Sequence, residues 1–155
     1  MRETYENKSS LEKESAFSRK IEMSWGCRLQ KMHKHHIIDY MVINNGAAVA
    51  WLEVKCLNRT YKQYPHFILS YSKYMKGVEY YRTSRLPFLF AVRLDDGDYY
   101  YRYDKTDNYK IIWGGRTKNT RDEFDVEPII QIPITEFKEI KWTVGIVIQK
   151  LYGVA

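Results

Sequence analysis

Two neighbouring apolar segments, 37–43 and 47–55, constrain the fold of this chain more than any other feature. Asn44-Asn45-Gly46 separates them, which predicts two adjacent antiparallel strands joined by a tight turn. Apolar residues occupy successive positions in both segments, so both faces of the resulting sheet are apolar. Such a sheet needs cover on each side. We therefore expect an α/β protein whose mixed central sheet is flanked by helices.

Three charged residues interrupt these apolar strands: Asp39 in the first, and Glu53 and Lys55 in the second. Side chains alternate along a strand, so Glu53 and Lys55 share a face. A two-residue turn at Asn45-Gly46 in a regular hairpin would point Asp39 to the opposite face. A three-residue loop, 44–46, or a β-bulge would restore a common face. We expect one of these irregularities, because two carboxylates and an ammonium on one face can bind a divalent cation and activate water.

The remaining periodicity predicts further elements. In chain order we expect a helix over 11–25, the strands 37–43 and 47–55, a helix over 65–81, strands over 86–94 and 99–103, and a short strand over 128–134. Ser9 or Ser10 can cap the first helix and Gly26 can end it. Two prolines place the strand at 128–134 at an edge or an end of its sheet.

Composition limits the classes of protein that fit. The 155 residues, 45% of them hydrophobic, suffice for one domain with a real core. Lys and Arg outnumber Asp and Glu by 25 to 19, and this net charge of +6 suits a polyanionic partner such as nucleic acid. Cys27 and Cys56 form no disulfide framework, and neither a signal-peptide core nor a membrane-length apolar run is present. We expect a cytoplasmic protein with no membrane partner and no organic cofactor.

Fourteen tyrosines are unusual in a chain this short, and many stand beside basic residues, as in the run 99–103. Aromatic rings next to cations can stack on bases while the cations meet phosphates. Tyrosine also fits half-buried strands and helices without any ligand, and for any single tyrosine that interpretation is favoured.

This order of elements and these charged residues resemble the PD-(D/E)XK nuclease superfamily, whose core is αβββαβ. The resemblance covers about 11–103, with the first short strand expected near 28–33, and leaves 104–155 as an extension of one domain over 1–155. Asp39 matches the strand acid, although Ile38 stands where proline often precedes it. Glu53 and Lys55 match the Glu-x-Lys element.

The same resemblance implies an acid in the first helix. Glu14 stands in a Glu-x-x-Phe-x-x-x-Ile spacing similar to that of the superfamily, although Glu12 and Glu22 share the helix and the choice between Glu14 and Glu22 stays open. The second helix often contributes a polar residue in these nucleases, and Ser70 or Lys73 could match it.

We therefore expect a metal-dependent endodeoxyribonuclease that uses Mg²⁺, with Mn²⁺ as a substitute. Asp39 and Glu53 would bind the metal, and the backbone carbonyl of Val54 would complete its ligands by resemblance. Lys55 would position the attacking water or stabilise the developing charge. Glu14 could bind a second metal or orient a metal-bound water.

DNA is the expected partner, with backbone contacts from a set of basic residues: Lys62, Lys73, Lys76, Arg116 and Lys118. In size the chain is similar to phage nucleases, junction resolvases and homing enzymes, which implies a host cell as its location. Such enzymes commonly pair, and the apolar tail at 142–152 offers a surface for a homodimer. The alternative function is a non-catalytic nucleic-acid-binding module built on tyrosines and basic residues.

Overall fold

The computed structural model describes residues 8–105, 108–115 and 126–142. Its elements in chain order are α1 (Lys8–Trp25), β1 (Arg28–Lys31), β2 (Tyr40–Asn44), β3 (Ala47–Cys56), β4 (His66–Ser70), α2 (Tyr71–Ser84), β5 (Phe88–Leu94), β6 (Gly97–Arg102), β7 (Lys110–Gly115), β8 (Val126–Pro133), the 3₁₀ turn Ile134–Glu136 and β9 (Lys138–Glu139). The six-stranded sheet has the order β1-β2-β3-β5-β6-β9, and a three-stranded sheet has the order β4-β8-β7. This is the expected α/β fold with a mixed sheet.

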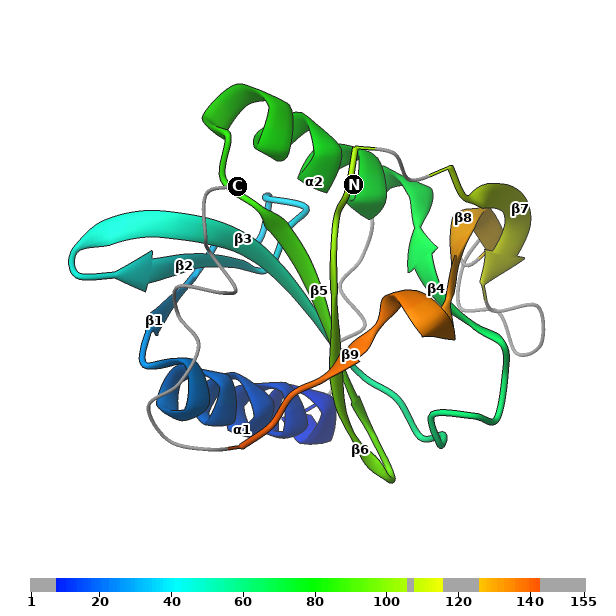
Figure 1. Ribbon diagram of the computed structural model, residues 1–155, viewed down its shortest axis with the longest axis horizontal. Coiled ribbons are helices and arrows are strands. Elements are labelled where there is room, and N and C mark those ends of the chain that lie inside the picture. The colour runs from blue at the N-terminus through cyan, green and yellow to red at the C-terminus, as the bar shows by residue number, and fades with distance from the viewer. Residues whose placement is uncertain (1–7, 106–107, 116–125, 143–155) are drawn as a thin grey trace.

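The two helices cover opposite faces of the large sheet, α1 below and α2 above in Figure 1. Phe17 and Ile21 of α1 belong to the core on one face, together with Leu52 of β3. Val78 of α2 and Phe90 of β5 belong to the core on the other face. The expected cover on both sides of an apolar sheet is therefore confirmed, and Gly26 ends α1 with a positive φ of 61° as expected.

The hairpin between β2 and β3 has a two-residue turn and not a three-residue loop. Asn44 pairs with Ala47, and Asn45 and Gly46 both have positive φ. A bulge then shifts the register, because Ile43 pairs with Ala48 and Val42 pairs with Ala50. Val49 is the extra residue. The bulge is thus the irregularity that returns Asp39 to the face of Glu53, since Tyr40, the next residue, pairs with Leu52.

The second helix begins at Tyr71, six residues later than Pro65. The segment His66–Ser70 is strand β4, in which Phe67 and Leu69 alternate into the core while Ile68 stays partly exposed. Including Phe67 in the helical pattern was wrong, because an antiparallel partner more than sixty residues away, β8, converts this segment to a strand.

Strand β8 is the central strand of the small sheet, so the expectation of an edge strand was wrong. Its prolines are tolerated for local reasons. Pro133 is the last residue of the strand, and Pro128 lies beyond Ile129, the last residue that pairs with β4. At Pro128 the strand therefore has β7 as its single neighbour.

Strands β3 and β5 are parallel, and α2 forms part of the connection between them. Gly77 lets the helix approach closely, because a Cβ at this position would lie 2.3 Å from the ring of Phe88. Among the described residues no helix is long and apolar enough to cross a membrane. The division into a core over 11–103 and an extension over 104–155 stays a prediction.

Candidate active site

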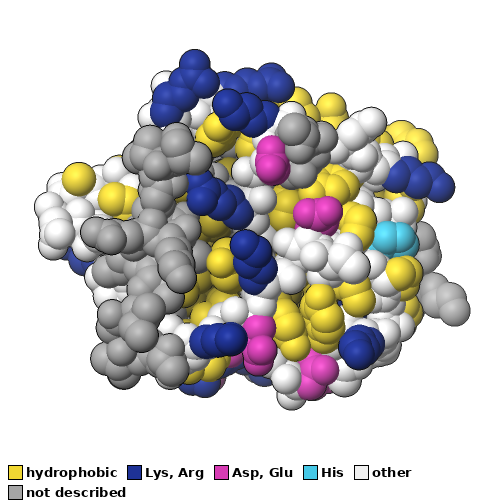
Figure 2. Space-filling model, in the orientation of Figure 1, with side chains coloured by type: hydrophobic (Ala, Val, Ile, Leu, Met, Phe, Trp, Pro, Cys, Tyr) yellow, Lys and Arg dark blue, Asp and Glu magenta, His cyan; other side chains and the backbone are white. Residues whose placement is uncertain are grey.

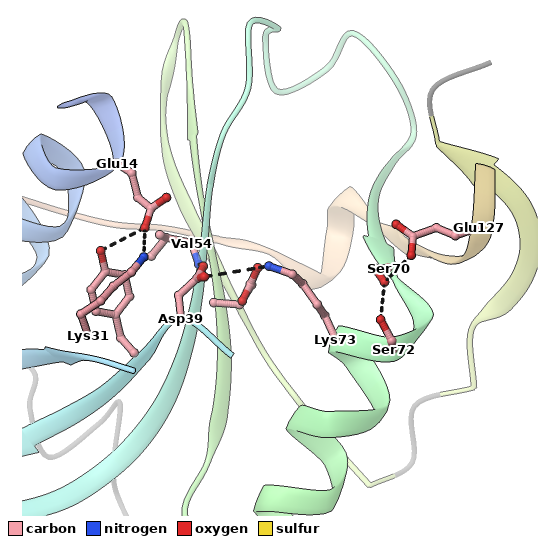
Figure 3. Close-up of polar contacts among 10 residues, drawn as sticks. Glu14, Lys31, Asp39, Val54, Ser70, Ser72, Lys73 and Glu127 are labelled. Carbon is pink, nitrogen blue, oxygen red and sulfur yellow. Dashed lines mark hydrogen bonds and ion pairs between the residues drawn. The ribbon is translucent and has the colours of Figure 1, made fainter. Parts of the chain in front are cut away.

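The carboxylates of Asp39 and Glu53 lie close enough together for one lysine ammonium to contact both. Figure 3 shows Asp39 beside Val54 of β3. Asp39 immediately precedes β2, and its Oδ2 accepts a hydrogen bond of 3.2 Å from the backbone N–H of Val54. This bond fixes the Asp39 carboxylate beside the neighbouring Glu53. The two predicted metal ligands therefore meet on one face, as the sequence requires.

Lys73, the third residue of α2, reaches this carboxylate pair from the α2 side of the sheet (Figure 3). Its ammonium donates a hydrogen bond to Glu53 Oε1 and lies 3.9 Å from Asp39 Oδ1. The sequence suggested Lys73 as a contact to nucleic-acid backbone, with a weaker match to the polar residue of the second helix. The structure places its ammonium inside the carboxylate site.

The carboxylate of Glu53 is almost completely removed from water, with 3% of the residue exposed. Burial raises the pKa of Glu53 to about 8; Lys73 opposes this rise, whereas Asp39 adds to it. Glu53 Oε2 is buried and has no hydrogen-bond partner within the described residues. A buried acceptor without a partner is costly, so one oxygen of this site lacks a donor or a cation.

Lys55 lies on the same face of β3 as Glu53, as strand alternation predicts. Burial lowers the pKa of Lys55, the charge of Lys73 lowers it further, and Glu53 and Glu127 raise it. Of the two lysines, Lys73 makes the direct contact to Glu53. Lys55 thus supplies a second, partly buried nitrogen whose proton is more easily lost than that of an ordinary lysine.

Glu14 approaches from the other face of the sheet, because α1 carries it (Figure 3). Its Oε1 accepts hydrogen bonds from Lys31 Nζ at 2.7 Å and from the Tyr40 hydroxyl at 3.1 Å. Burial alone would lower the pKa of Lys31, but Glu14 and neighbouring charges raise it to about 12. Glu22 instead accepts the backbone N–H of Leu29 at 3.0 Å. Of these two acids of α1, Glu14 is therefore the one whose carboxylate is held at β1 and β2, through Lys31 and Tyr40.

The other predicted DNA contacts are spread out. Lys62 is exposed in the loop that follows β3, and Lys76 pairs with Glu79 at 2.8 Å on the outer side of α2. Arg116 and Lys118 lie outside the described residues, as does the apolar tail after Trp142 on which the dimer prediction rests. On the face seen in Figure 2, basic side chains gather over α2 and are otherwise scattered among apolar and acidic ones.

The tyrosines form a packed aromatic network. Among the described tyrosines only Tyr64 is exposed, at 55%. Tyr61 stacks on Tyr99 with ring centroids 4.3 Å apart, and Tyr74 contacts the rings of Tyr103 and Tyr109 edge-on. Packing therefore accounts for most of the unusual tyrosine content, which leaves little of it for a base-stacking platform.

Sequence reasoning missed Glu127, because a single acid before a proline carries no recognisable pattern. Its Oε2 accepts a 3.1 Å hydrogen bond from the Ser70 hydroxyl at the start of α2 (Figure 3). Its position near Lys55 and α2 depends on the pairing of β4 with β8, which no local signal reveals.

The donor set suits a hard cation. Within the described residues no group of three or more His, Cys, Asp or Glu side chains is arranged to hold a metal. Asp39 and Glu53 supply two carboxylates, and Mg²⁺ typically takes one or two from the protein and fills its shell with water and substrate phosphate. The buried, unpartnered Glu53 Oε2 is the atom that a cation would satisfy. These residues therefore fit a divalent metal.

This α/β fold, with acids and lysines clustered on its central sheet, is the arrangement expected of the PD-(D/E)XK class. The family model described as "Phage putative PDDEXK endonuclease" matches residues 1–140. The chain belongs to this family of phage PDDEXK endonucleases. Comparison with curated proteins finds no match.

One similar solved structure is the Holliday junction resolvase Hjc from Archaeoglobus fulgidus. It is 14% identical, covers 60% of this chain and 86% of its own, and has a TM-score of 0.43. A likeness this distant does not bear on substrate or mechanism.

Proposed function

We propose that this protein is an endonuclease that hydrolyses DNA phosphodiester bonds with a divalent cation, Mg²⁺ or Mn²⁺, at Asp39 and Glu53. The observation that carries the proposal is the Glu53 carboxylate: it is buried, one of its oxygens has no partner among the residues that the structure describes, and it shares a lysine with Asp39. A protein that gained nothing from this arrangement would replace the buried acid with an apolar side chain at lower cost.

Each residue has a role in this proposal. Asp39 and Glu53 would hold the cation, with the Val54 carbonyl as a further ligand, and a cation there would supply activation of water and neutralisation of negative charge at the phosphate. Lys55, on the same face of β3 as Glu53, positions the attacking water or stabilises the developing charge beside the phosphate. Glu14, held by Lys31 and Tyr40, orients solvent on the α1 side.

Lys73 has a different role before the cation arrives. Its ammonium lies against Glu53 in the metal-free protein and opposes the rise in the pKa of that carboxyl group. Occupation of the carboxylates by a cation would free this ammonium to contact a substrate phosphate, which agrees with the predicted backbone contact. Lys62 and Lys76, with Arg116 and Lys118, would contribute outer contacts, and pairing of two copies would allow both strands to be cut.

The first test is cleavage of plasmid, single-stranded and four-way-junction DNA with Mg²⁺, Mn²⁺ or EDTA. We expect cutting that requires a divalent cation. Glu53→Gln and Asp39→Asn should each lower the rate by at least about 100-fold, the effect of removing one source of transition-state stabilisation. Glu139→Gln, at an exposed position of β9, is the matched control and should cut like the wild type.

The alternative of a non-catalytic binding module makes the opposite prediction. Salt-sensitive DNA binding without cutting, unchanged in Glu53→Gln and indifferent to metal, would reject the nuclease proposal. The packed tyrosines make this alternative the weaker one, because only Tyr64 among those described offers an open ring.

A further inference from the structure

The N-cap of α2 lacks the usual side-chain hydrogen bond to the first turn of the helix. Ser70 is the N-cap residue, yet its side chain makes no capping hydrogen bond to the helix. A serine at this position ordinarily accepts a backbone N–H of the first turn. The Ser70 hydroxyl instead donates to Glu127 Oε2 at 3.1 Å. Its oxygen lies 2.8 Å from the Ser72 hydroxyl. A hydroxyl has a single proton, so Ser72 must donate to Ser70, and the chain of hydrogen bonds ends on Glu127.

Glu127, which ends this series of hydrogen bonds, lies on β8, a strand that is paired on both sides. Ser70 of β4 pairs with Ile129 of β8, and Glu127 lies two residues before Ile129, hence on the same face. On the other side of β8, Glu127 pairs with Gly114 of β7. The small sheet therefore sets the position of the Glu127 backbone.

We propose that Glu127 is a positioning residue of the active site: through Ser70 and Ser72 it fixes the first turn of α2 and so keeps Lys73 against Glu53 and Asp39. The inference rests on the function proposed above. Lys73 directly follows Ser72, so a displacement of the first turn moves its ammonium. Figure 3 shows the two ends of this path, with Glu127 and the serines on one side of Lys73 and the carboxylates on the other.

The decisive measurement is the pKa of Glu53 in the metal-free protein, followed by carbon-detected NMR of its carboxyl group. Lys73 lowers this pKa, so loosening Lys73 must raise it. We expect Glu127→Ala and Ser70→Ala each to raise the pKa of Glu53 by about one unit or more. Glu127→Gln keeps an acceptor for Ser70 and should leave it near the wild-type value. Glu136→Ala, an exposed acid of the 3₁₀ turn, is the matched control and should change nothing.

Cleavage provides the second arm. Under single turnover with saturating Mg²⁺ and saturating DNA, Glu127→Ala and Ser70→Ala should cut about 10- to 100-fold more slowly, because a small misplacement of a reacting group costs that much. The double variant should be no worse than either single one, since both break the same path. Glu127→Gln should restore the rate to within about threefold of the wild type.

The outcomes separate the two proposals. An unchanged pKa of Glu53 in both alanine variants, or a Glu127→Gln variant as impaired as Glu127→Ala, overturns the positioning role. A raised pKa of Glu53 in a protein that cuts no DNA with any metal rejects the nuclease and keeps the positioning role. If Glu127→Ala fails to fold, Ser70→Ala, which removes only a hydroxyl, carries the same test.

Discussion

A carboxylate deep inside a protein must be neutralised by a proton, by a partner or by a metal, and Glu53 shows the competition among all three. Burial raises its pKa to about 8, so the proton competes with the other two near neutral pH. The Lys73 ammonium favours the ionised form of Glu53. Burial alone would lower the pKa of Lys73, but the neighbouring carboxylates outweigh burial and raise it. The metal-free site is therefore costly to the fold, and a cation would relieve that cost.

The pH dependence of stability tests this view of Glu53. Between its ordinary pKa of 4.5 and about 8, the folded protein keeps a proton on Glu53 that the unfolded chain loses. The folded state binds more protons in this window, so the free energy of unfolding should fall as the pH rises, by about 1.4 kcal/mol per unit from this group. Urea unfolding at several pH values should show a flatter dependence for Glu53→Gln.

Adding Mg²⁺ provides a second test of the pH dependence of the free energy of unfolding. Saturating Mg²⁺ favours the ionised Glu53 and should flatten the pH dependence of the wild type. Identical curves for the wild type and Glu53→Gln, with and without Mg²⁺, would show that Glu53 titrates as an ordinary exposed carboxyl.

At the scale of elements, the bulge in β3 and the placement of α2 decide whether the site exists. One extra residue, Val49, sets the face on which Glu53 stands relative to Asp39. The helix then has to lie close enough to β5 for Lys73 to reach both acids. Gly77 permits this approach, because any Cβ there would overlap the fully buried ring of Phe88.

Gly77→Ala tests the close approach of α2. Alanine is the better helix former by about 1 kcal/mol. Overpacking against a buried ring costs about 1–3 kcal/mol, and at 2.3 Å the overlap is severe enough to prevail. We expect a net loss of about 1–2 kcal/mol in the free energy of unfolding, together with slower cleavage because Lys73 moves with the helix.

Met75→Ala is the control for this helix, since Met75 is 37% exposed. It should cost less stability than Gly77→Ala and leave cleavage unchanged. A Gly77→Ala protein that is more stable than the wild type would show that helix propensity outweighs the contact with Phe88.

At the scale of the whole molecule, the segment after residue 103 adds strands to both sheets, beside elements that come much earlier in the chain. Strand β8 supports β4 and brings Glu127 to the start of α2. Strand β9 then pairs with β6 at the edge of the large sheet. Asp98 joins the elements at this edge: its carboxylate accepts hydrogen bonds from Arg93 Nε at 3.0 Å and from the indole of Trp142 at 2.9 Å, and its carbonyl accepts the N–H of Ile140.

Asp98→Ala should therefore destabilise the whole protein. It would leave the Arg93 guanidinium, partly buried in this network, without its carboxylate, and removal of one partner of a buried pair costs about 3 kcal/mol. Urea unfolding and amide hydrogen exchange measure the loss, which should include faster exchange at Ile140. Asp95→Ala, in an exposed turn, is the control. An Asp98→Ala protein as stable as this control would show that packing alone holds β9.

The sequence by itself determined the apolar two-faced sheet, its helical cover, and the pairing of Asp39 with Glu53 and Lys55, because these follow from local alternation, turn residues and the need to bury apolar surface. It predicted that the hairpin needs an irregularity, and left the choice between a loop and a bulge open. Only the tertiary structure decided three features: that His66–Ser70 is a strand, that Lys73 contacts Glu53, and that Glu127 lies beside the start of α2. These features depend on partners distant along the chain, and no short pattern records such partners.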